Sequence, residues 1–507
     1  MTAPDGERRS FSSRTPNNEN PERISYRRGF VTRHQVTGWR FLTRRIASGV
    51  ALHDTRMLVD PLRTQSRSVL VGALILVTGL IGCFLFSMIR PSGSAGTDSV
   101  LADRESAALY VRLGDRLHPV LNLASARLIT GRPDNPTLVK SSELDKFARG
   151  NMLGIPGAPE RMVANTTRDA YWTVCDAATG APGSTGVTVI AGEPATGGER
   201  AASLPATHAV LAESDGRTWL LWDGRRSPVD LADRAVVDGL GIGGAVAVRP
   251  IATGLFNALP EAPPLISPVI PDAGAPARVD LPVAAPVGAV VVSYDADNTL
   301  RHYVVLSDGL QPISGVLASI LRNTNSYGLD QPPRLGPDDV ARIPEARALD
   351  TTAYPRDPVT LVDSDADPVT CAAWAKPAGA QTASLTILSG AALPVPDGLR
   401  SVELVSSGTP GGPADRVVLS PGTGYFVDSG GARFWVSDTG VRYGIDTGDD
   451  PAGMDTVGAL GLTSPPLPVP WSMLSQFAAG PTLSRADALL AHDSLAPNPA
   501  PARMEIP

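Results

Sequence analysis

The sequence predicts an α+β protein in which a single transmembrane helix precedes an internally duplicated outer region of β-hairpin and helix repeats. Three observations support this class. An uncharged apolar run lies near the N-terminus, a hairpin-like pattern follows it four times, and two cysteines lie at matching positions of the two halves of the outer region. The chain contains 50 glycines and 47 prolines, which is typical of short strands joined by turns. Its 507 residues are enough for two to four domains.

The apolar run SVLVGALILVTGLIGCFLFSMI occupies residues 68–89, and Arg67 and Arg90 border it. As a helix, this run is long enough to cross the hydrocarbon core of a bilayer, which is about 30 Å thick. Its many Leu, Ile, Val and Phe residues favour membrane insertion by roughly 4 to 8 kcal/mol. A buried core helix would carry a polar face, and a signal peptide would be shorter and closer to the N-terminus. We therefore predict a transmembrane helix over residues 68–89.

Charge is distributed unevenly on the two sides of this run. Residues 1–67 contain 13 arginines and 6 acidic residues, whereas the whole chain has a net charge of −7, so residues 91–507 are acidic overall. The positive-inside rule therefore places the N-terminus in the cytoplasm and residues 90–507 in the periplasm. We expect a single-pass protein of the inner membrane, with its outer region in an oxidising compartment.

The cytoplasmic segment divides into two parts. Residues 1–26 are polar and are predicted to be disordered. Residues 27–67 predict a basic amphipathic helix that Pro61 should end. We expect it to dock on a partner protein; binding to anionic lipid alone is the first alternative, and binding to nucleic acid is disfavoured because no such motif is present. The predicted docking residues are the apolar stripe Val36, Trp39, Leu42 and Ile46 and the arginines Arg40, Arg44 and Arg45.

The outer region repeats one pattern four times. In each copy an aromatic residue opens an apolar run, a glycine follows, and a proline or glycine falls nine residues after the aromatic. A glycine beside Asp or Thr favours a hairpin turn, and a helix-like stretch follows, so each copy predicts a strand, a turn, a short strand and a helix. The copies are YVRLGDRLHPV (110–120), WLLWDGRRSPV (219–229), YVVLSDGLQPI (303–313) and WVSDTGVRYGI (435–445), within repeats expected near 100–150, 210–250, 295–345 and 430–465.

The spacing of the copies indicates an internal duplication. Cys175 follows Tyr110 at nearly the distance at which Cys371 follows Tyr303. Equivalent points near a two-fold axis lie close together, so we predict a disulfide between Cys175 and Cys371. The alternative is two free buried thiols. We expect the nearby Trp172 and Trp374 to cover the bridge, and Cys83 to pack within the membrane span.

Motifs of catalysis are missing from the sequence. There is no GxxxxGK[ST] phosphate loop and no GxSxG elbow, and the six histidines are isolated from one another. We therefore predict no catalytic residue, no metal and no cofactor. The alternatives to a structural role are an envelope enzyme that hydrolyses ATP or another nucleotide, or that cleaves cell wall, and a peptidoglycan-binding anchor.

Several longer motifs occur in order on both sides of the predicted membrane span. They are RRGFVTRHQVTGWRF, DTRMLVDPLRTQSR, GIPGAPERM (154–162), WTVCD, DPVTCAAW, LPEAPPL and GPTLSRADALLAHD. Together they resemble the EccB family, a core membrane component of the mycobacterial type VII (ESX) secretion system. The resemblance covers about residues 20–495. The residues of these motifs are most similar to those of the family member from the system linked to iron acquisition.

The resemblance implies an elongated periplasmic region, in which the four repeats surround a central β-rich domain with one disulfide. That domain would come from about residues 160–205 and 355–425, and a Pro-rich tail would occupy 494–507. The implied partners are the motor ATPase EccC, EccD, EccE, other EccB copies and the mycosin protease. We therefore expect a non-enzymatic subunit that anchors and assembles the channel and motor complex for protein export. Its basic helix should dock on EccC and EccD. ATP hydrolysis has been proposed for the family, and none of these residues supports it.

Overall fold

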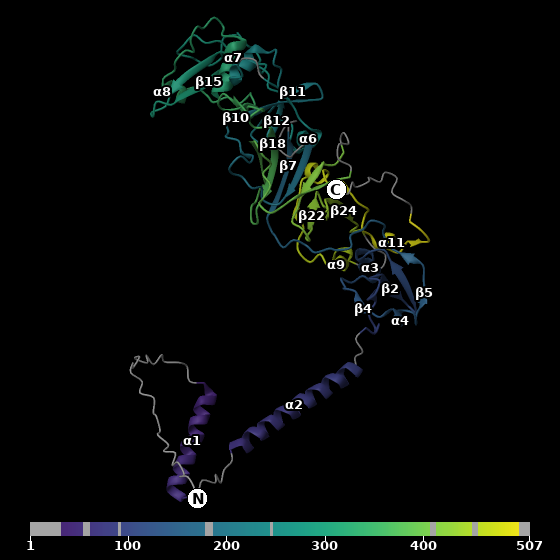
Figure 1. Cartoon of the computed structure of the whole chain (residues 1–507). Helices are drawn as coiled ribbons and strands as arrows, with labels where there is room; N and C mark the ends of the chain where they lie inside the picture. Colours follow the sequence, from purple (N-terminus) through teal and green to yellow (C-terminus); the bar gives the residue numbers. More distant parts are fainter. Residues whose placement is uncertain are drawn as a thin grey trace, which may run out of the picture. The chain divides into compact units, whose positions relative to one another are not determined.

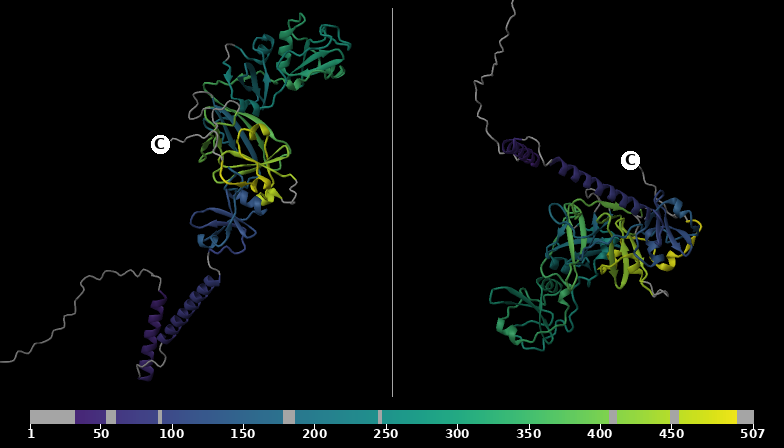
Figure 2. Two further views of the ribbon diagram at one scale, coloured as in Figure 1. Left: turned by 90° about the vertical axis from the view of Figure 1, so that its right-hand side faces the viewer. Right: turned by 90° about the horizontal axis from the view of Figure 1, so that it is seen from below.

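The computed structural model describes residues 32–53, 61–89, 93–177, 186–243, 247–405, 412–448 and 455–495. The chain divides into two compact units, Met1–Pro91 and Ser92–Pro507. The described part of the first unit is helical, and that of the second consists mainly of strands with short helices (Figures 1 and 2). This mixture confirms the α+β class. The predicted disordered tail 1–26 and residues 496–507 of the predicted Pro-rich tail lie outside the described residues.

Helix α1 (Arg33–Leu52) begins at a capping box. The backbone N–H of Gln35 donates to the Thr32 hydroxyl at 3.4 Å, and the backbone N–H of Thr32 donates to the Gln35 side chain at 3.0 Å. The helix ends at Leu52, where His53 takes a left-handed backbone with φ of 49°. The expected end at Pro61 is therefore wrong. Pro61 instead begins the next helix, a position that suits proline because the first N–H of a helix has no partner in it.

Helix α2 (Pro61–Ile89) contains the whole predicted apolar run. Its segment Ser66–Phe86 has 21 residues with a mean hydropathy of 2.7, and none of that segment is buried within the structure. The one hydroxyl in the middle of the run is satisfied locally, since Thr78 Oγ1 donates to the Leu74 carbonyl at 2.8 Å. By length and composition this helix can cross a membrane.

Each repeat of the second unit folds as three antiparallel strands followed by a helix. The predicted hairpin forms the second and third strands, and a first strand that the pattern did not include precedes it. The first repeat contains β1 (Val100–Asp103), β2 (Leu109–Leu113), β3 (Arg116–Val120) and α3 (Leu123–Thr130). The second contains β10 (His208–Ser214), β11 (Arg217–Trp222), β12 (Arg225–Pro228) and α5 (Arg234–Leu240).

The third and fourth repeats have the same order of elements. The third contains β14 (Val290–Tyr294), β15 (Leu300–Leu306), β16 (Gly309–Ile313) and α7 (Gly315–Thr324). The fourth contains β22 (Tyr425–Ser429), β23 (Ala432–Val436), β24 (Val441–Ile445) and α9 (Thr456–Leu460). In all four repeats a polar N-cap side chain accepts a backbone N–H of the first helical turn, which fixes where the helix begins. The caps are Asn122, Asp233, Ser314 and Asp455.

Turn chemistry explains the hairpins of the second repeat. Asp215 and Gly216 between β10 and β11, and Asp223 and Gly224 between β11 and β12, all have positive φ. Two successive residues with positive φ form the tight turn whose twist matches that of paired strands, and Asp followed by Gly is the residue pair that tolerates it best. The dipeptide therefore determines both turns locally.

Short parallel segments cover the outer edges of the repeat sheets. Beside the first strand of three repeats lie β4 (Thr137–Val139), β13 (Arg249–Pro250) and β25 (Leu467–Pro468). Beside the third strand of the first and fourth repeats lie β5 (Ala148–Arg149), β6 (Met152–Leu153) and β26 (Ala478–Ala479). β17 (Thr360–Leu361) also pairs with β10, and β27 (Ala491–His492) pairs with β6. These pairings satisfy backbone groups that an open sheet edge would expose.

Both halves of the second unit contribute strands to one central sheet. Its order is β20 (Ser401–Glu403), β21 (Arg416–Val418), β8 (Gly186–Ala191), β7 (Ala170–Ala177), β18 (Val369–Lys376), β19 (Ser384–Gly390) and β9 (Ala202–Ser203). The four inner strands are antiparallel, and each half supplies one adjacent pair of them. Outside them the two-fold relation is lost, because β21 pairs with β8 in parallel whereas β9 pairs with β19 in antiparallel.

The repeats pack in pairs that cross between the halves. Helix α3 of the first repeat contacts α9 of the fourth, and helix α5 of the second contacts α7 of the third. One apolar core therefore joins repeats one and four, and another joins repeats two and three. If repeat one matches repeat three and repeat two matches repeat four, these two contacts are equivalent, which agrees with the predicted duplication.

Two short helices cover one face of the central sheet. α6 (Thr253–Ala258) contacts β7 and β18, and α10 (Trp471–Leu474) contacts β7 and α6. This face belongs to the largest apolar core, which includes Trp172 and Val174. The opposite face carries a smaller core around the two cysteines. The remaining short helices are α4 (Ser141–Leu144), α8 (Pro337–Arg342), the 3₁₀ turn Thr351–Ala353 and α11 (Arg485–Ala488).

Candidate functional site

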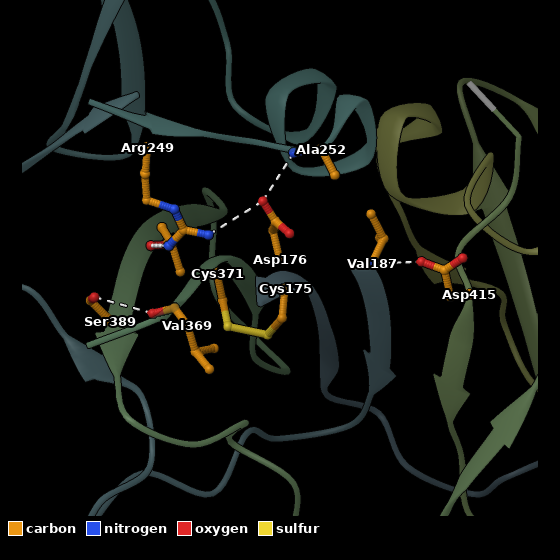
Figure 3. A network of polar contacts seen from close by, with 10 residues as sticks. Cys175, Asp176, Val187, Arg249, Ala252, Val369, Cys371, Ser389 and Asp415 are labelled. Atoms are coloured by element: carbon orange, nitrogen blue, oxygen red, sulfur yellow. Dashed lines mark hydrogen bonds and ion pairs between the residues drawn. A yellow bond between two sulfur atoms is a disulfide. The ribbon is translucent and has the colours of Figure 1, made fainter. Parts of the chain in front are cut away.

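Two cysteines meet in the middle of the central sheet. In the register between β7 and β18, Cys175 lies directly opposite Cys371, and their Cα atoms are 3.9 Å apart. The sulfur atoms form a disulfide between residues that are 196 positions apart in the sequence, and both side chains are fully buried (Figure 3). The expected disulfide is therefore present, and it joins the two halves of the duplication.

The apolar cover of the disulfide is not the expected one. Trp172 and Trp374 do lie opposite each other, but they are three residues from the cysteines, and side chains on a strand alternate between faces. They therefore belong to the face of α6 and α10, and the expectation that they cover the bridge is wrong. The residues that pack around the cysteines are Val369 of the same strand as Cys371 and residues of neighbouring strands, which include Ile190, Leu388 and Val418.

Trp172 instead connects the central sheet to the fourth repeat. Its ring meets those of Tyr425 and Phe477 edge to face, with centroids 5.5 and 6.3 Å apart. Its indole N–H donates to the Pro468 carbonyl at 3.0 Å. A residue of the first half thus fills the core of the second half, which ties the halves together on this face of the sheet as well.

A buried ion pair lies on the same face as Trp172. Asp176 directly follows the disulfide cysteine, and its carboxylate accepts from Arg249 at 3.3 Å and from the backbone N–H of Ala252 at 2.9 Å. Arg249 also donates to the Thr370 hydroxyl at 2.7 Å. Figure 3 shows this carboxylate reaching away from the disulfide toward β13 and the start of α6. One side chain therefore attaches the second repeat and α6 to the central sheet.

Burial determines the electrostatics of this pair. The Asp176 and Arg249 side chains are only 7% and 4% exposed. Burial raises the pKa of the Asp176 carboxyl, although the Ala252 N–H and Arg249 oppose the rise, and it lowers the pKa of the Arg249 guanidinium. Asp415, which accepts from the Val187 N–H at 2.7 Å, adds repulsion that raises the pKa of Asp176 further. Removing either partner would leave an uncompensated charge in the core.

Sequence reasoning did not find this pair. Asp176 stands in an otherwise apolar strand, on the same face as Trp172 and Val174, and that position is a signal for a buried partner. The partner Arg249 lies 73 residues further along in a two-residue strand, and no local pattern indicates the pairing.

Two arginines occupy matching places in the third strands of repeats two and four. Arg226 lies over the Phe256 ring at 3.7 Å and donates to the carbonyls of Phe256 and Leu259 at the end of α6. Arg442 lies over the Trp471 ring at 5.0 Å and donates to the Phe477 carbonyl just after α10. Burial lowers the pKa of both guanidinium groups. Each arginine thus attaches one repeat to the helix that covers the central sheet.

The predicted docking residues of α1 lie on the surface of that helix. Val36, Trp39, Leu42 and Ile46 are all exposed, Trp39 by 72%, and Val50 continues the stripe at 75%. Arg40, Arg44 and Arg45 are also exposed. No described residue of the chain buries this stripe, and Met57, which continues the pattern in the sequence, lies outside the described residues.

Among the described residues, no group of three or more His, Cys, Asp and Glu side chains is arranged to hold a metal ion. The disulfide, the Asp176–Arg249 pair and the two arginine contacts each connect one segment of the chain to another.

Comparison with a family model and with similar proteins points to the same family. Residues 28–497 match the family model described as "Type VII secretion system ESX-1, transport TM domain B". The chain is 67% identical to the "ESX-3 secretion system ATPase EccB3" of Mycolicibacterium smegmatis, over 100% of this chain and 99% of that protein. It is 63% identical to the protein of the same name in Mycobacterium tuberculosis, over 98% and 96%.

Solved structures give the same result. The chain resembles a chain of an intact ESX-5 inner membrane complex with a TM-score of 0.74 and 38% identity, over 95% of this chain and 99% of that one. It resembles a chain of the EccB3 dimer from the ESX-3 core complex with a TM-score of 0.70 and 62% identity, over 78% of this chain and 100% of that one.

Proposed function

The chain belongs to the EccB family of type VII secretion proteins, and from this membership we propose that it is a structural subunit of an ESX-3-type secretion complex in the inner membrane. The observation that carries the proposal is the architecture of the second unit. Its disulfide, its buried ion pair and its arginine contacts all join segments of the chain. Relatives with the same fold occur in a solved ESX-5 inner membrane complex and in the EccB3 dimer from the ESX-3 core complex.

The proposed orientation has the N-terminus in the cytoplasm and the second unit in the periplasm. Helix α2 provides the one candidate span among the described residues, and the 13 arginines of residues 1–67 lie before its uncharged run 68–89. The disulfide supports an outer location for the second unit, because disulfides persist in oxidising compartments. A single cysteine introduced after α2 and labelled by a membrane-impermeant thiol reagent in intact cells tests the orientation. Labelling only after lysis would contradict it.

The proposed partners follow from the family and from α1. We assign the apolar stripe of α1 to docking on the motor subunit EccC and on EccD, with the arginines orienting the helix. EccE and the mycosin protease are further proposed contacts. A second copy of the chain is proposed because a solved relative is an EccB3 dimer.

The proposed role is non-enzymatic. The relatives carry the word ATPase in their names, whereas this sequence contains no GxxxxGK[ST] phosphate loop. The full chain, purified without the motor subunit, should therefore release no phosphate from ATP above a buffer blank. Turnover that follows the chain through purification and is lost on one substitution in its second unit would establish the enzyme alternative.

One experiment tests complex membership directly. The tagged chain, extracted from native membranes in mild detergent, should elute in a large assembly that contains other secretion subunits. Recovery of the chain as a lone monomer, with its disulfide intact on a non-reducing gel, would contradict the proposal. Binding of the purified chain to isolated peptidoglycan would support the wall-anchor alternative.

A further inference from the structure

The arginines of α1 are not arranged evenly around the helix. Arg33, Arg40 and Arg44 follow one another at steps of seven and four residues, which keeps them within about 40° of one another at about 100° per residue. We call these three residues the arginine ridge. The apolar stripe of Val36, Trp39, Leu42, Ile46 and Val50 lies beside them, so the ridge borders the stripe along one side only.

The other side of the apolar stripe carries less positive charge than the ridge. Its only arginine is Arg45, which lies about 140° around the axis from Arg40. Gly38 also lies on this side, and a Cβ added there would meet no atom within 4 Å. Phe41, 38% exposed, points away from the stripe. A helix lying flat on a bilayer would turn Phe41 toward water and would give Arg45 the same role as Arg40.

The charge of the ridge is not neutralised by α1 itself. The helix, RHQVTGWRFLTRRIASGVAL, contains four arginines and no acidic residue. None of the four forms an ion pair with another described residue. Among the described residues, the ridge is therefore an exposed positive surface that is free to meet carboxylates of a partner.

We propose that α1 binds a protein groove that is apolar at its floor and lined with carboxylates along one rim only, the rim that faces Arg33, Arg40 and Arg44. This inference rests on the proposed docking function of α1 and specifies the chemistry of the partner surface. The apolar stripe enters the groove and provides the binding free energy. The ridge sets the direction in which the helix lies, because the reversed orientation would bring the arginines to the neutral rim.

Two charge reversals of equal size provide the test. The full chain carries an affinity tag and is expressed with the other subunits of its complex, either as Arg40→Glu or as Arg45→Glu, which makes the same charge change on the other side of the stripe. After extraction in mild detergent, Arg40→Glu should lower recovery of the cytoplasmic partner about tenfold. Arg45→Glu should lower it by only about threefold, because Arg45 adds to the general attraction but does not face the carboxylates. Equal losses of partner recovery in both variants, or no loss in either, would contradict the proposal that carboxylates line only one rim of the groove.

An experiment with lipid distinguishes binding of α1 in a protein groove from binding of α1 to a bilayer surface. The full chain is reconstituted in phosphatidylcholine nanodiscs in three forms: alone, with its partner subunits, and alone with phosphatidylglycerol added to the lipid. Backbone hydrogen exchange over residues 33–52 is then measured. Slow exchange that requires the partner subunits supports the groove. Slow exchange that appears on addition of phosphatidylglycerol alone would mean that α1 binds anionic lipid, and would overturn the proposal.

Substitution of Trp39 distinguishes the failure of this inference from the failure of the docking function itself. Trp39→Ala removes the largest side chain of the stripe without changing the charge. If its partner recovery equals that of the wild type, α1 is not a docking helix and both proposals fail. If Trp39→Ala loses the partner while Arg40→Glu and Arg45→Glu behave alike, docking stands and only the one-sided acidic rim is wrong.

Discussion

The two halves of the second unit share one architecture and stabilise it by different means. Helices α5 and α9 end alike, at Leu240 and Leu460, and each is followed by a glycine with left-handed backbone. The Leu240 carbonyl accepts the backbone N–H of Val359 at 2.8 Å, whereas the Leu460 carbonyl accepts from the Arg127 guanidinium at 3.2 Å. Both halves thus end this helix with a carbonyl that needs a donor. The donor comes from the opposite half in each case, as a backbone N–H for α5 and as a side chain for α9.

The same difference appears in how closely the helices approach. Gly239, next to the end of α5, faces Ile320 of α7, and a Cβ added there would lie 2.5 Å from Ile320 Cγ1. The matching residue of α9 is Ala459, which is buried in the structure. At the central sheet, the residue after Cys175 is Asp176, whereas the residue after Cys371 is Ala372. Equivalent positions therefore carry different packing and electrostatic constraints.

The largest expected effect on stability comes from Asp176, because the first half has this charge after its cysteine and the second half does not. Asp176→Ala or Arg249→Met should each lower the free energy of unfolding of the second unit by about 3 to 5 kcal/mol, because the remaining charge stays buried. The double variant should lose much less than the sum. Urea unfolding of the full chain in detergent, followed by tryptophan fluorescence, measures this. Additive losses would mean that the pair is not coupled.

The pH dependence of the same residue gives a second measurement. Burial raises the pKa of Asp176 in the folded state, so the folded protein binds this proton more tightly than the unfolded chain. The contribution of Asp176 to stability should therefore fall as pH rises from about 4 through its raised folded pKa. Asp176→Asn should lack this contribution. An unchanged difference between wild type and Asp176→Asn across that window would contradict the assigned environment.

The next effect tests the bridge between the halves. Cys371→Ser should lower the free energy of unfolding by about 2 to 4 kcal/mol, because the unfolded chain gains the freedom of the opened loop. Cys83→Ser is the matched control, since Cys83 is a free and exposed cysteine. It should change neither the unfolding transition nor the non-reducing gel mobility. Labelling of Cys175 by a thiol reagent in the unreduced wild type would contradict the disulfide.

A smaller effect distinguishes the two contacts between repeats. Gly239→Ala should destabilise the contact of repeats two and three by about 1 to 3 kcal/mol, because α5 lies against Ile320 without room for a methyl group. Hydrogen exchange should quicken in α5 and α7 and stay unchanged in α3 and α9. The double variant with Ile320→Ala should lose less stability than the sum of the two single variants, because the shortened side chain makes room for the methyl group. If Gly239→Ala alone is neutral, the close approach of the helices is not what holds this contact.

The smallest effect concerns the matching contact of repeats one and four. Arg127→Met should cost about 1 to 2 kcal/mol, because the Leu460 carbonyl loses its donor in a partly buried place. Exchange should quicken in α9 but not in α5. Arg132→Met, an exposed arginine at the end of the same helix, serves as the control. Equal effects of Arg127→Met and Arg132→Met would mean that the hydrogen bond to Leu460 contributes nothing specific.

Much of the fold could be predicted because its signals are local. The run 68–89 predicts a membrane helix by its length and lack of charge alone. The two hairpins of the second repeat follow from Asp–Gly dipeptides whose backbone preference is intrinsic. The disulfide was predictable for another reason, since the duplication placed Cys175 and Cys371 at equivalent points.

Other features needed the register and the long-range packing. The first strand of each repeat escaped the pattern. β1 and β10 contain no Phe, Trp or Tyr, and in β14 and β22 no proline or glycine falls nine residues after the aromatic. Trp172 was assigned to the wrong face, although its odd offset from Cys175 already placed it opposite the bridge once β7 is a strand. At the candidate site, the cysteines were predicted and the charged pair beside them was not.

By itself, the sequence determined the candidate membrane span, the hairpins, the amphipathic α1 and the pair of cysteines, because each depends on neighbouring residues or on a repeated spacing. Only the tertiary structure decided that repeat one packs on repeat four and repeat two on repeat three, and that Asp176 pairs with Arg249. The physical reason is that these choices depend on which distant segments exclude water together. A carboxylate in an apolar strand indicates that a partner is needed, but the free energy that selects Arg249 exists only after the sheet, α6 and β13 have assembled.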